Sequence, residues 1–272
     1  MLYAIGGLWG YLLLLIPGRA RNATIKNLET CFPEKNPQQI RLLARQSLQN
    51  TACTALEMGK SWLLPMDKAI SLVTEVEGME QLQSAYHKKQ GIILLAPHLG
   101  NWEIFAYYIS QNIASTFLYQ QPKLPGLDRL LRKSRSRGGI KLAAANSSGV
   151  GQLLAALRKG ELVGILPDQV PPVPGGCYAP FFGEQAYTMT LVSKLIQRTG
   201  ARVFCGFAQR MPNATGFRVI VKEAHEGIYA DQLELSVVGL NKSVEQSVEM
   251  AVAQYQWEYK RFRHRPDGEK FY

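Results

Sequence analysis

The sequence predicts an α/β fold with a mainly parallel central sheet flanked by helices. Short apolar runs alternate with helical stretches along the middle of the chain. The run at 91–96, GIILLA, is apolar throughout, as expected for a strand buried on both faces. Strand–helix alternation favours parallel pairing, because each crossover helix returns the chain to the same end of the sheet. The 272 residues are enough for one such domain.

The first long element is a helix over Pro37–Leu63. Asn36 is a favourable N-cap, Pro37 suits the first helical position, and Pro65 stops the apolar periodicity. Strands are then predicted at 91–96, 116–119, 141–145 and 162–166, and helices at 102–111, 126–137 and 149–159. Residues 202–209 and 217–222 are predicted as two later strands, an antiparallel edge, and residues 244–261 as a last helix.

The N-terminal segment is the most apolar part of the chain. Residues 1–18, MLYAIGGLWGYLLLLIPG, carry no charge, and Arg19, Arg21 and Lys26 follow. About 18 apolar residues are just enough to cross a hydrocarbon core of roughly 30 Å. A signal peptide would place the basic residues before the run, whereas basic residues after it put the rest of the chain in the cytoplasm. We expect a membrane-anchoring helix over 1–18, spanning or half-inserted, and a single domain over 19–272; a buried core helix is the alternative.

The chain is basic, with a formal net charge of +10, which favours an anionic partner such as nucleic acid, an anionic membrane surface or a phosphorylated substrate. No recognised nucleic-acid motif accompanies the charge, and the apolar N-terminus favours a membrane. One predicted helix and its exit concentrate basic residues, opposed only by Asp128. This cluster is either a solvated helix face or an anion site for phosphorylated headgroups or an acidic carrier. It comprises Arg129, Arg132, Lys133, Arg135, Arg137 and Lys141.

The candidate chemistry follows the buried strand at 91–96. His98 stands just after it, at the edge where sheet-based active sites form. Asn101 is a plausible N-cap for the next helix, which places Glu103 in the first helical turn, able to reach back to the imidazole. A histidine base and a carboxylate that fixes its tautomer make a catalytic pair; a structural histidine is the alternative. Asp168 follows the strand at 162–166 on the same edge, and either shapes the site or caps a turn.

The sequence offers a base without a nucleophile of its own. There is no Gly-x-Ser-x-Gly elbow and no cysteine in a catalytic context, which favours direct activation of a substrate hydroxyl. No phosphate-binding Walker loop is present. The four cysteines lack paired spacing, so we expect reduced core thiols, no zinc site and no cofactor. Glu57, on or beside the apolar stripe of its helix, is expected to be partnered or edge-exposed.

Several short motifs, in order and spacing, make the chain resemble the bacterial lipid A biosynthesis acyltransferases, the lauroyl/myristoyl transferase family, within the wider glycerolipid and lysophospholipid acyltransferase superfamily. The similarity runs over nearly the whole chain. The motifs are Asn27-Leu28, Cys31-Phe32-Pro33-Glu34, His98-Leu99-Gly100-Asn101-Trp102-Glu103, Gln121-Pro122-Lys123, Leu127-Asp128-Arg129-Leu130, Pro167-Asp168-Gln169, Pro180-Phe181-Phe182-Gly183, Tyr255-x-Trp257 and Arg261-Phe262.

The resemblance implies an inner-membrane enzyme facing the cytoplasm. It implies acyl carrier protein as the thioester donor and a hydroxyl of a lipid A precursor as the acceptor. His98 and Glu103 match the family's catalytic motif, with His98 as general base oriented by Glu103. Arg135 matches an arginine near the site and Asp168 an acidic residue of a later motif. Together with Asn101 and Arg132, these two form the predicted substrate-binding set.

Three other readings remain open from the sequence. The acceptor is another lysophospholipid or glycolipid, or the enzyme is a membrane-bound thioesterase or hydrolase that delivers the acyl group to water. From a different class, the chain is a non-catalytic basic module that binds membrane or nucleic acid.

Overall fold

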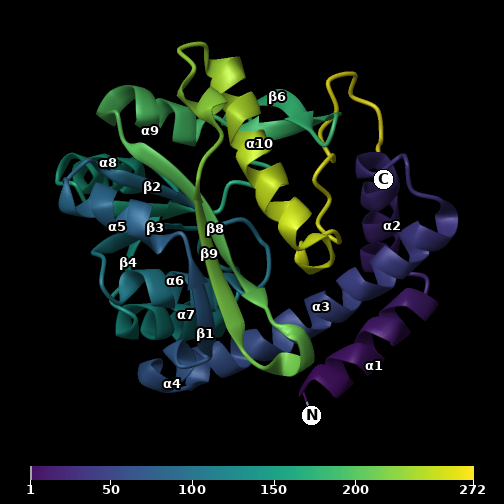
Figure 1. Cartoon of the computed structure of the whole chain (residues 1–272). Helices are drawn as coiled ribbons and strands as arrows, with labels where there is room; N and C mark the ends of the chain where they lie inside the picture. The colour runs from purple at the N-terminus through teal and green to yellow at the C-terminus, as the bar shows by residue number, and fades with distance from the viewer. Residues whose placement is uncertain (1) are drawn as a thin grey trace.

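The central feature of the computed structural model, which describes residues 2–272, is a seven-stranded sheet with the order β1-β9-β8-β2-β5-β3-β4 (Figure 1). Neighbouring strands are parallel apart from β8 and β9, which are antiparallel. This confirms the predicted mainly parallel sheet. The strands are β1 (Val73–Glu77), β2 (Ile92–Leu95), β3 (Ser115–Tyr119), β4 (Lys141–Ala144), β5 (Leu162–Ile165), β8 (Arg202–Arg210) and β9 (Phe217–Glu223).

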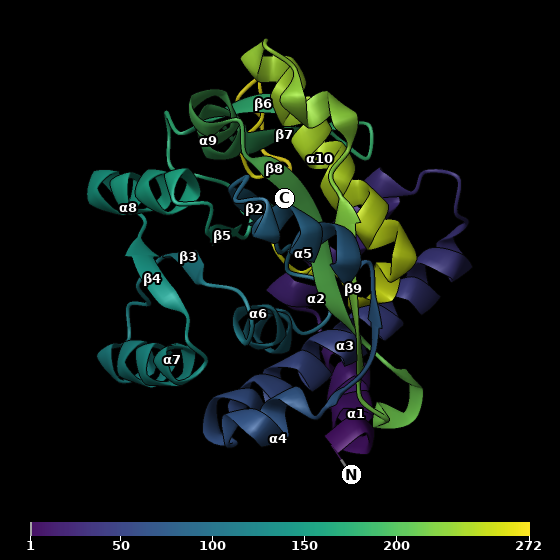
Figure 2. The same ribbon diagram turned by 60° about the vertical axis from the view of Figure 1, so that its left-hand side comes forward.

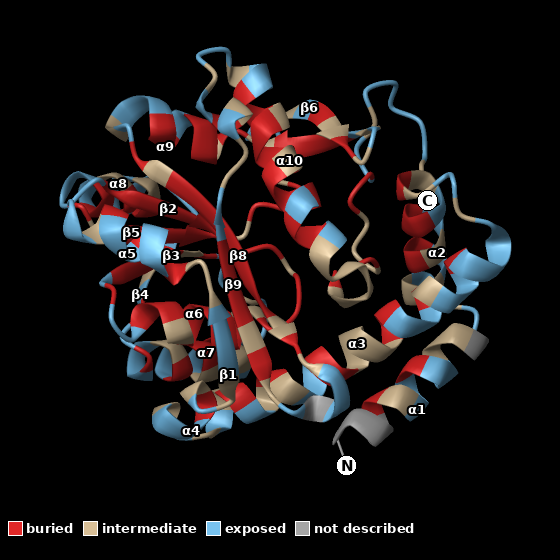
Figure 3. Ribbon diagram, viewed as in Figure 1, coloured by how far each residue is buried: buried red, intermediate tan, exposed pale blue. Residues whose placement is uncertain are grey.

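Helices cover both faces of the sheet. On strand β2, Ile92 and Leu94 pack toward α5 (Met79–His87) and α6 (Trp102–Ser110), while Ile93 and Leu95 pack toward α8 (Ser147–Arg158) and α9 (Leu191–Thr199). All four side chains are fully buried (Figure 3), which is why this run is apolar throughout. At the β4 edge, the strand lies between α8 and α7 (Pro125–Arg137), as Figure 2 shows.

Helix α3 (Pro37–Leu63) has the predicted bounds. The Asn36 side chain accepts hydrogen bonds from the backbone N–H groups of Gln38 and Gln39, each at 3.0 Å, and Gln39 accepts one from the Asn36 N–H at 2.9 Å. This reciprocal capping box explains why the helix begins where the sequence predicts. The short helix α4 (Met66–Ile70) follows.

The N-terminal segment folds as helix α1 (Leu2–Leu15), and a second helix, α2 (Arg19–Cys31), begins after Pro17. The 14 residues of α1, at about 1.5 Å each, are shorter than a hydrocarbon core of about 30 Å. Within residues 2–272, no helix has the length and apolar character needed to cross a membrane. Of the two alternatives predicted for residues 1–18, the spanning helix is therefore wrong, because the helix ends before Pro17, and the half-inserted helix stays a prediction.

Helix α1 instead lies alongside α3 (Figure 1). Two glycines one turn apart, Gly6 and Gly10, face α3 at close range. A Cβ on Gly6 would stand 2.4 Å from the Cys53 sulfur, and one on Gly10 would stand 2.4 Å from the Cα of Gln49. Glycine at these two positions thus lets one face of α1 pack directly on α3.

The C-terminal third differs from the prediction. The last helix, α10, runs over Leu233–Met250 and not over 244–261, and an irregular segment follows, beginning with the 3-10 turn η3 (Val252–Gln254). Tyr255 and Trp257 are buried there, and the Asn27 amide donates to the carbonyl of Trp257 at 2.7 Å. Individual contacts of this kind hold the segment in place, and it has no helix face packed on the core. The helical spacing of its apolar residues therefore predicted the wrong structure.

Several remaining elements were not predicted. They include the hairpin β6 (Gly176–Phe181) and β7 (Glu184–Met189), together with η1 (Pro212–Ala214) and η2 (Glu226–Tyr229). Strands β8 and β9 are antiparallel as predicted, but β1 pairs outside β9, so they do not form the edge. The cysteines are free thiols, three of them buried and Cys177 half-buried, as the spacing suggested.

Candidate active site

Two adjacent parallel strands bring the predicted histidine and aspartate together. Strands β2 and β5 are paired with Leu95 opposite Ile165, and His98 and Asp168 each stand three residues after their strand. Because parallel strands end at the same edge of a sheet, the two side chains meet there. The expectation that Asp168 helps to shape the His98 site is thus supported by their contact.

Asp168 contacts both the ring and the backbone of His98. The ring Nδ1 lies 2.8 Å from Asp168 Oδ1, and the backbone N–H of His98 donates to Oδ2 at 2.8 Å. Asp168 is 4% exposed. Burial opposes its charge, but the His98 ring and these hydrogen bonds lower the pKa of the Asp168 carboxyl below its ordinary value. A carboxylate that accepts from Nδ1–H leaves the lone pair on Nε2, which is the tautomer a general base requires.

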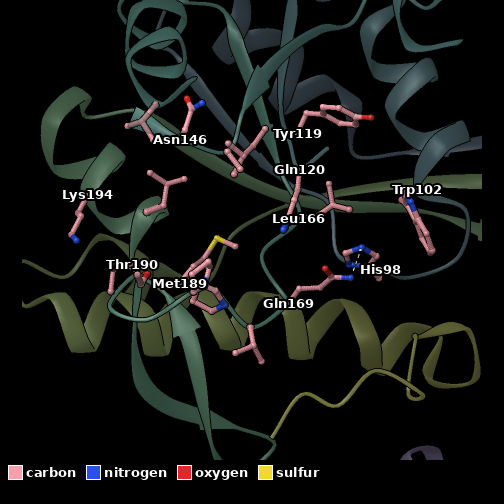
Figure 4. Close-up of a pocket in the computed structure, with 18 of the residues that line it drawn as sticks. His98, Trp102, Tyr119, Gln120, Asn146, Leu166, Gln169, Met189, Thr190 and Lys194 are labelled. Atoms are coloured by element: carbon pink, nitrogen blue, oxygen red, sulfur yellow. Dashed lines mark hydrogen bonds between the residues drawn. The ribbon is translucent and has the colours of Figure 1, made fainter. Parts of the chain in front are cut away.

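The other ring nitrogen of His98 faces a cavity. Its Nε2 is 3.1 Å from the Gln169 side-chain amide (Figure 4), and both residues line the cavity. The Trp102 ring meets the imidazole edge-on, with 4.9 Å between ring centroids. The imidazole is therefore clamped between its carboxylate and an aromatic ring, with its basic nitrogen turned to the cavity.

The loop that carries His98 is fixed from two directions. Gly100 has φ +61°, and a Cβ there would lie 2.1 Å from the carbonyl oxygen of Ala208 on β8. Only glycine fits so close an approach at positive φ. From the C-terminal segment, the backbone N–H of Gln256 donates to the His98 carbonyl at 3.1 Å.

Asn101 acts within this loop as the predicted N-cap. It is fully buried, accepts a hydrogen bond from the Ile104 N–H at 3.0 Å, and donates to Glu57 at 3.3 Å. Glu57 is itself bonded to the buried Arg210, so it is partnered as expected. Asn101 lies outside the cavity lining, behind His98.

Glu103 does not reach back to His98 in this structure. Its carboxylate, on a residue that is 2% exposed, forms two hydrogen bonds with the Arg135 guanidinium, one of them from Nε at 3.3 Å. Within residues 2–272, the partners of the His98 ring nitrogens are Asp168 and Gln169. The first turn of α6 points Glu103 toward α7, so the orienting contact predicted for it is made by Asp168.

Helix α7 contributes one half-buried arginine and several exposed basic residues. The Arg135 side chain is 17% exposed and lines the cavity. Burial opposes its charge, but the Glu103 carboxylate raises the pKa of Arg135 above its ordinary value. Arg132 is 48% exposed, donates to Asp128 at 3.0 Å, and does not line the cavity. The solvated-face interpretation thus fits Arg132, whereas an anion site at Arg135 stays a prediction.

The cavity has a volume of about 530 Å³. Figure 4 shows His98 and Trp102 at one end, and Asn146 and Lys194 at the other. Apolar side chains occupy much of the wall between them, including Leu118, Val150, Leu166, Met189 and Leu191. A cavity with polar ends and apolar walls suits an elongated amphiphilic molecule.

The fold and the site define a class of enzyme. A histidine–carboxylate dyad beside an apolar cavity can activate a substrate hydroxyl or water, and no serine or cysteine is among the residues described as lining this cavity. Such a site is typical of an enzyme that transfers a group to a hydroxyl or to water, with a lipid-like substrate in its cavity.

The chain matches the bacterial lipid A biosynthesis acyltransferase family over residues 1–264 and belongs to that family; it is an acyltransferase of lipid A biosynthesis. It is 29% identical to the lipid A biosynthesis lauroyltransferase of Escherichia coli K12, over 98% of this chain and 87% of that protein. It is 26% identical to the palmitoleoyltransferase of the same organism, over 92% and 81%. A lipid A biosynthesis acyltransferase of Haemophilus influenzae is 27% identical, over 93% and 79%.

Proposed function

We propose that the enzyme transfers a fatty-acyl group from the thioester of acyl carrier protein to a hydroxyl of a lipid A precursor. The observation that carries this proposal is the orientation of His98, with Asp168 behind the ring and Nε2 turned to the cavity. The amphiphilic cavity supports a lipid acceptor. The names of the relatives, a lauroyltransferase and a palmitoleoyltransferase, support a fatty-acyl group.

In the proposed reaction, the acceptor hydroxyl replaces the Gln169 amide at Nε2 of His98. His98 takes the hydroxyl proton as the oxygen attacks the thioester carbonyl, and Asp168 stabilises the imidazolium that forms. The carbon–sulfur bond then breaks, the new ester is released, and the leaving thiolate takes the proton from His98. No nucleophile from the protein is required.

The remaining predicted residues act around this step. Arg135 holds an acceptor phosphate or the developing oxyanion at the cavity wall, and Glu103 acts through Arg135 by holding its guanidinium. Asn101 positions the His98 loop from behind. Arg132, exposed on α7, contributes to attracting an acidic carrier or anionic lipid.

The test is His98→Ala, assayed by mass spectrometry of lipid products from an acyl carrier protein thioester. Loss of a general base should lower the transfer rate by about 10²–10⁴-fold. His87→Ala, at an exposed histidine on α5, is the control and should leave the rate unchanged. A His98→Ala enzyme with near-normal turnover would remove the base from the proposal, and release of free fatty acid by the wild type would indicate a hydrolase.

We further propose that α1 lies in the membrane interface, at the cytoplasmic face of the inner membrane. One face of α1 packs on α3, while Leu8, Trp9 and Leu12 are exposed, with Leu8 at 62% and Trp9 at 59%. Apolar side chains gathered on one exposed helix face are typical of interfacial helices. Arg19, which follows the segment, is also exposed and suits an anionic surface.

Substituting Leu8→Ser and Trp9→Ser together tests this placement. Since burying a large apolar side chain is worth about 1.5–3 kcal/mol, binding to vesicles of anionic phospholipid should weaken by at least about tenfold. Leu235→Ser, at an exposed leucine on α10, is the matched control and should bind as the wild type does. Equal sedimentation of all three proteins with vesicles would contradict an interfacial α1.

A further inference from the structure

A second cavity, of about 290 Å³, shares the catalytic histidine with the first. His98 and Trp102 line both cavities, so the two cavities meet at these side chains. The rest of the small cavity comes from α3 and from the segment after α10, and none of those residues lines the large cavity. A reaction with two substrates thus has two separate spaces that meet at its base.

The two cavities differ in charge. Arg135 and Lys194 line the large cavity, whereas no lysine or arginine is among the residues described as lining the small one. Instead, the small cavity carries Glu258, whose carboxylate accepts a hydrogen bond from the Thr51 hydroxyl at 3.0 Å. A carboxylate without a cation repels a phosphate, while it accepts hydrogen bonds from N–H and O–H groups.

The polar side of the small cavity supports binding of an uncharged amide chain. Gln254, Gln256 and Glu258 come from one segment, and Thr51 and Thr54 face them from α3. The Gln254 amide already bonds the backbone of Arg210, and the Thr54 hydroxyl accepts from the Arg210 guanidinium. The Gln256 amide and the Glu258 carboxylate therefore supply the hydrogen bonds to a ligand. Met58 and Trp62 add apolar wall. A narrow, uncharged chain that alternates amides with methylene groups matches this lining.

The segment that lines the small cavity is also bonded to the catalytic loop. The Gln256 N–H donates to the His98 carbonyl, and the Gly100 N–H donates to the Gln254 carbonyl, each at 3.1 Å. A molecule bound along this segment is therefore held at a fixed distance from the imidazole.

The position of the reacting nitrogen decides which substrate enters which cavity. Nε2 of His98 contacts Gln169, which lines only the large cavity. The acceptor hydroxyl has to reach that nitrogen, so the lipid acceptor occupies the large cavity, with its anionic groups near Arg135 or Lys194. The space that remains for the thioester donor to approach His98 is the small cavity.

We propose that the small cavity receives the uncharged, amide-bearing arm that presents the acyl thioester, so that donor arm and lipid acceptor approach His98 from separate cavities. This inference rests on the proposed thioester-dependent transfer. It assigns a site for the donor arm to residues of α3 and to Gln254, Gln256 and Glu258, whose side chains the sequence motifs did not single out.

Two exposed alanines, one lining each cavity, give a matched pair of variants: Ala55→Trp fills the small cavity and Ala145→Trp fills the large one. The probe is S-methyl pantetheine, an unreactive arm without an acyl chain, titrated at millimolar concentration by NMR. Ala55→Trp should abolish its binding and raise the KM for the thioester donor by at least about tenfold. Ala145→Trp should bind the probe as the wild type does. Thermal unfolding checks that both variants are folded.

Other outcomes separate the two proposals. Probe binding lost in Ala145→Trp and kept in Ala55→Trp would place the arm in the large cavity and overturn the inference. So would a wild type that transfers acyl groups but neither binds the probe nor responds to Ala55→Trp. A wild type that transfers no acyl group from any thioester would instead refute the proposed function itself.

Discussion

Two buried carboxylates flank the cavity, and their surroundings differ. Asp168 follows a sheet strand and binds both the backbone and the ring of His98. Glu103 lies in the first turn of α6 and binds Arg135 on α7, so that pair joins two helices. Histidine can exchange a proton near neutral pH, whereas arginine stays charged. The first pair is therefore suited to proton transfer and the second to holding a fixed positive charge at the cavity wall.

The two pairs also differ in how closely the fold fixes the positions of their side chains. Asp168 and His98 are placed by paired parallel strands, with Leu95 opposite Ile165, and the contact includes a backbone N–H. The position of Arg135 relative to Glu103 depends on how α7 packs against α6. Rigid strand ends are the better platform for a base, because proton transfer requires hydrogen-bond distances.

The largest effect should come from Asp168→Asn, which keeps the shape of the side chain but loses its charge. An amide in place of the orienting carboxylate favours the wrong tautomer, so kcat should fall by about 10²–10⁴-fold. Glu103→Gln is the comparison variant and should cost less, because Glu103 acts only through Arg135. A larger loss of kcat in Glu103→Gln than in Asp168→Asn would show that Glu103 orients the base after all.

Asp168→Asn should also change how the free energy of unfolding depends on pH. The pKa of Asp168 is lowered in the folded protein, against the effect of burial, by the contacts from His98. Its stabilising contribution is therefore complete above the ordinary carboxyl pKa of about 3.9 and is lost as the pH falls through the lower folded value. The difference in unfolding free energy between wild type and Asp168→Asn, measured with urea, should shrink as the pH falls below the ordinary carboxyl pKa of about 3.9.

Local signals in the sequence predicted much of the sheet. The apolar run of β2 and the Asn36 cap of α3 each depend on neighbouring residues alone, and both elements were confirmed. The hairpin β6–β7 was missed, because its residues, GCYAPF and EQAYTM, show little alternation of apolar and polar side chains. The segment at 252–261 was predicted as helix, because its anchors, such as Asn27, lie far away in the sequence.

The candidate site was predictable in its location but not in its pairing. Strand ends place His98 and Asp168 at one edge of a parallel sheet, and this follows from the sequence. Which carboxylate meets the imidazole depends on the direction in which α6 leaves the loop, and the sequence pattern does not fix that direction. The nearer residue, Glu103, was assigned to His98, whereas the contact comes from Asp168. The small cavity was missed for a similar reason, since 254–258 belongs to the misassigned segment.

A smaller effect, and a sharper test of the second pair, should come from a double-mutant cycle on Glu103 and Arg135. Removing one partner leaves a buried charge uncompensated, which typically costs about 3–5 kcal/mol of stability. Arg135→Gln and Glu103→Gln should each destabilise the protein, and the double variant should be less destabilised than the sum of the two. Activity should stay low in the double variant, because the guanidinium of Arg135 is still missing from the cavity wall.

Arg132→Ala provides the control for charge alone. It removes an exposed arginine from the same helix face, so its effect on stability should be about 0–1 kcal/mol, and its effect on activity should diminish as salt is added. The cycle is read from urea unfolding together with acyl-transfer rates at low and high ionic strength. Additive effects of Glu103→Gln and Arg135→Gln, within about 0.5 kcal/mol, would mean that the two side chains are not coupled. Equal, salt-sensitive losses in Arg135→Gln and Arg132→Ala would reduce α7 to a diffuse basic surface and leave His98 and Asp168 as the site's essential pair.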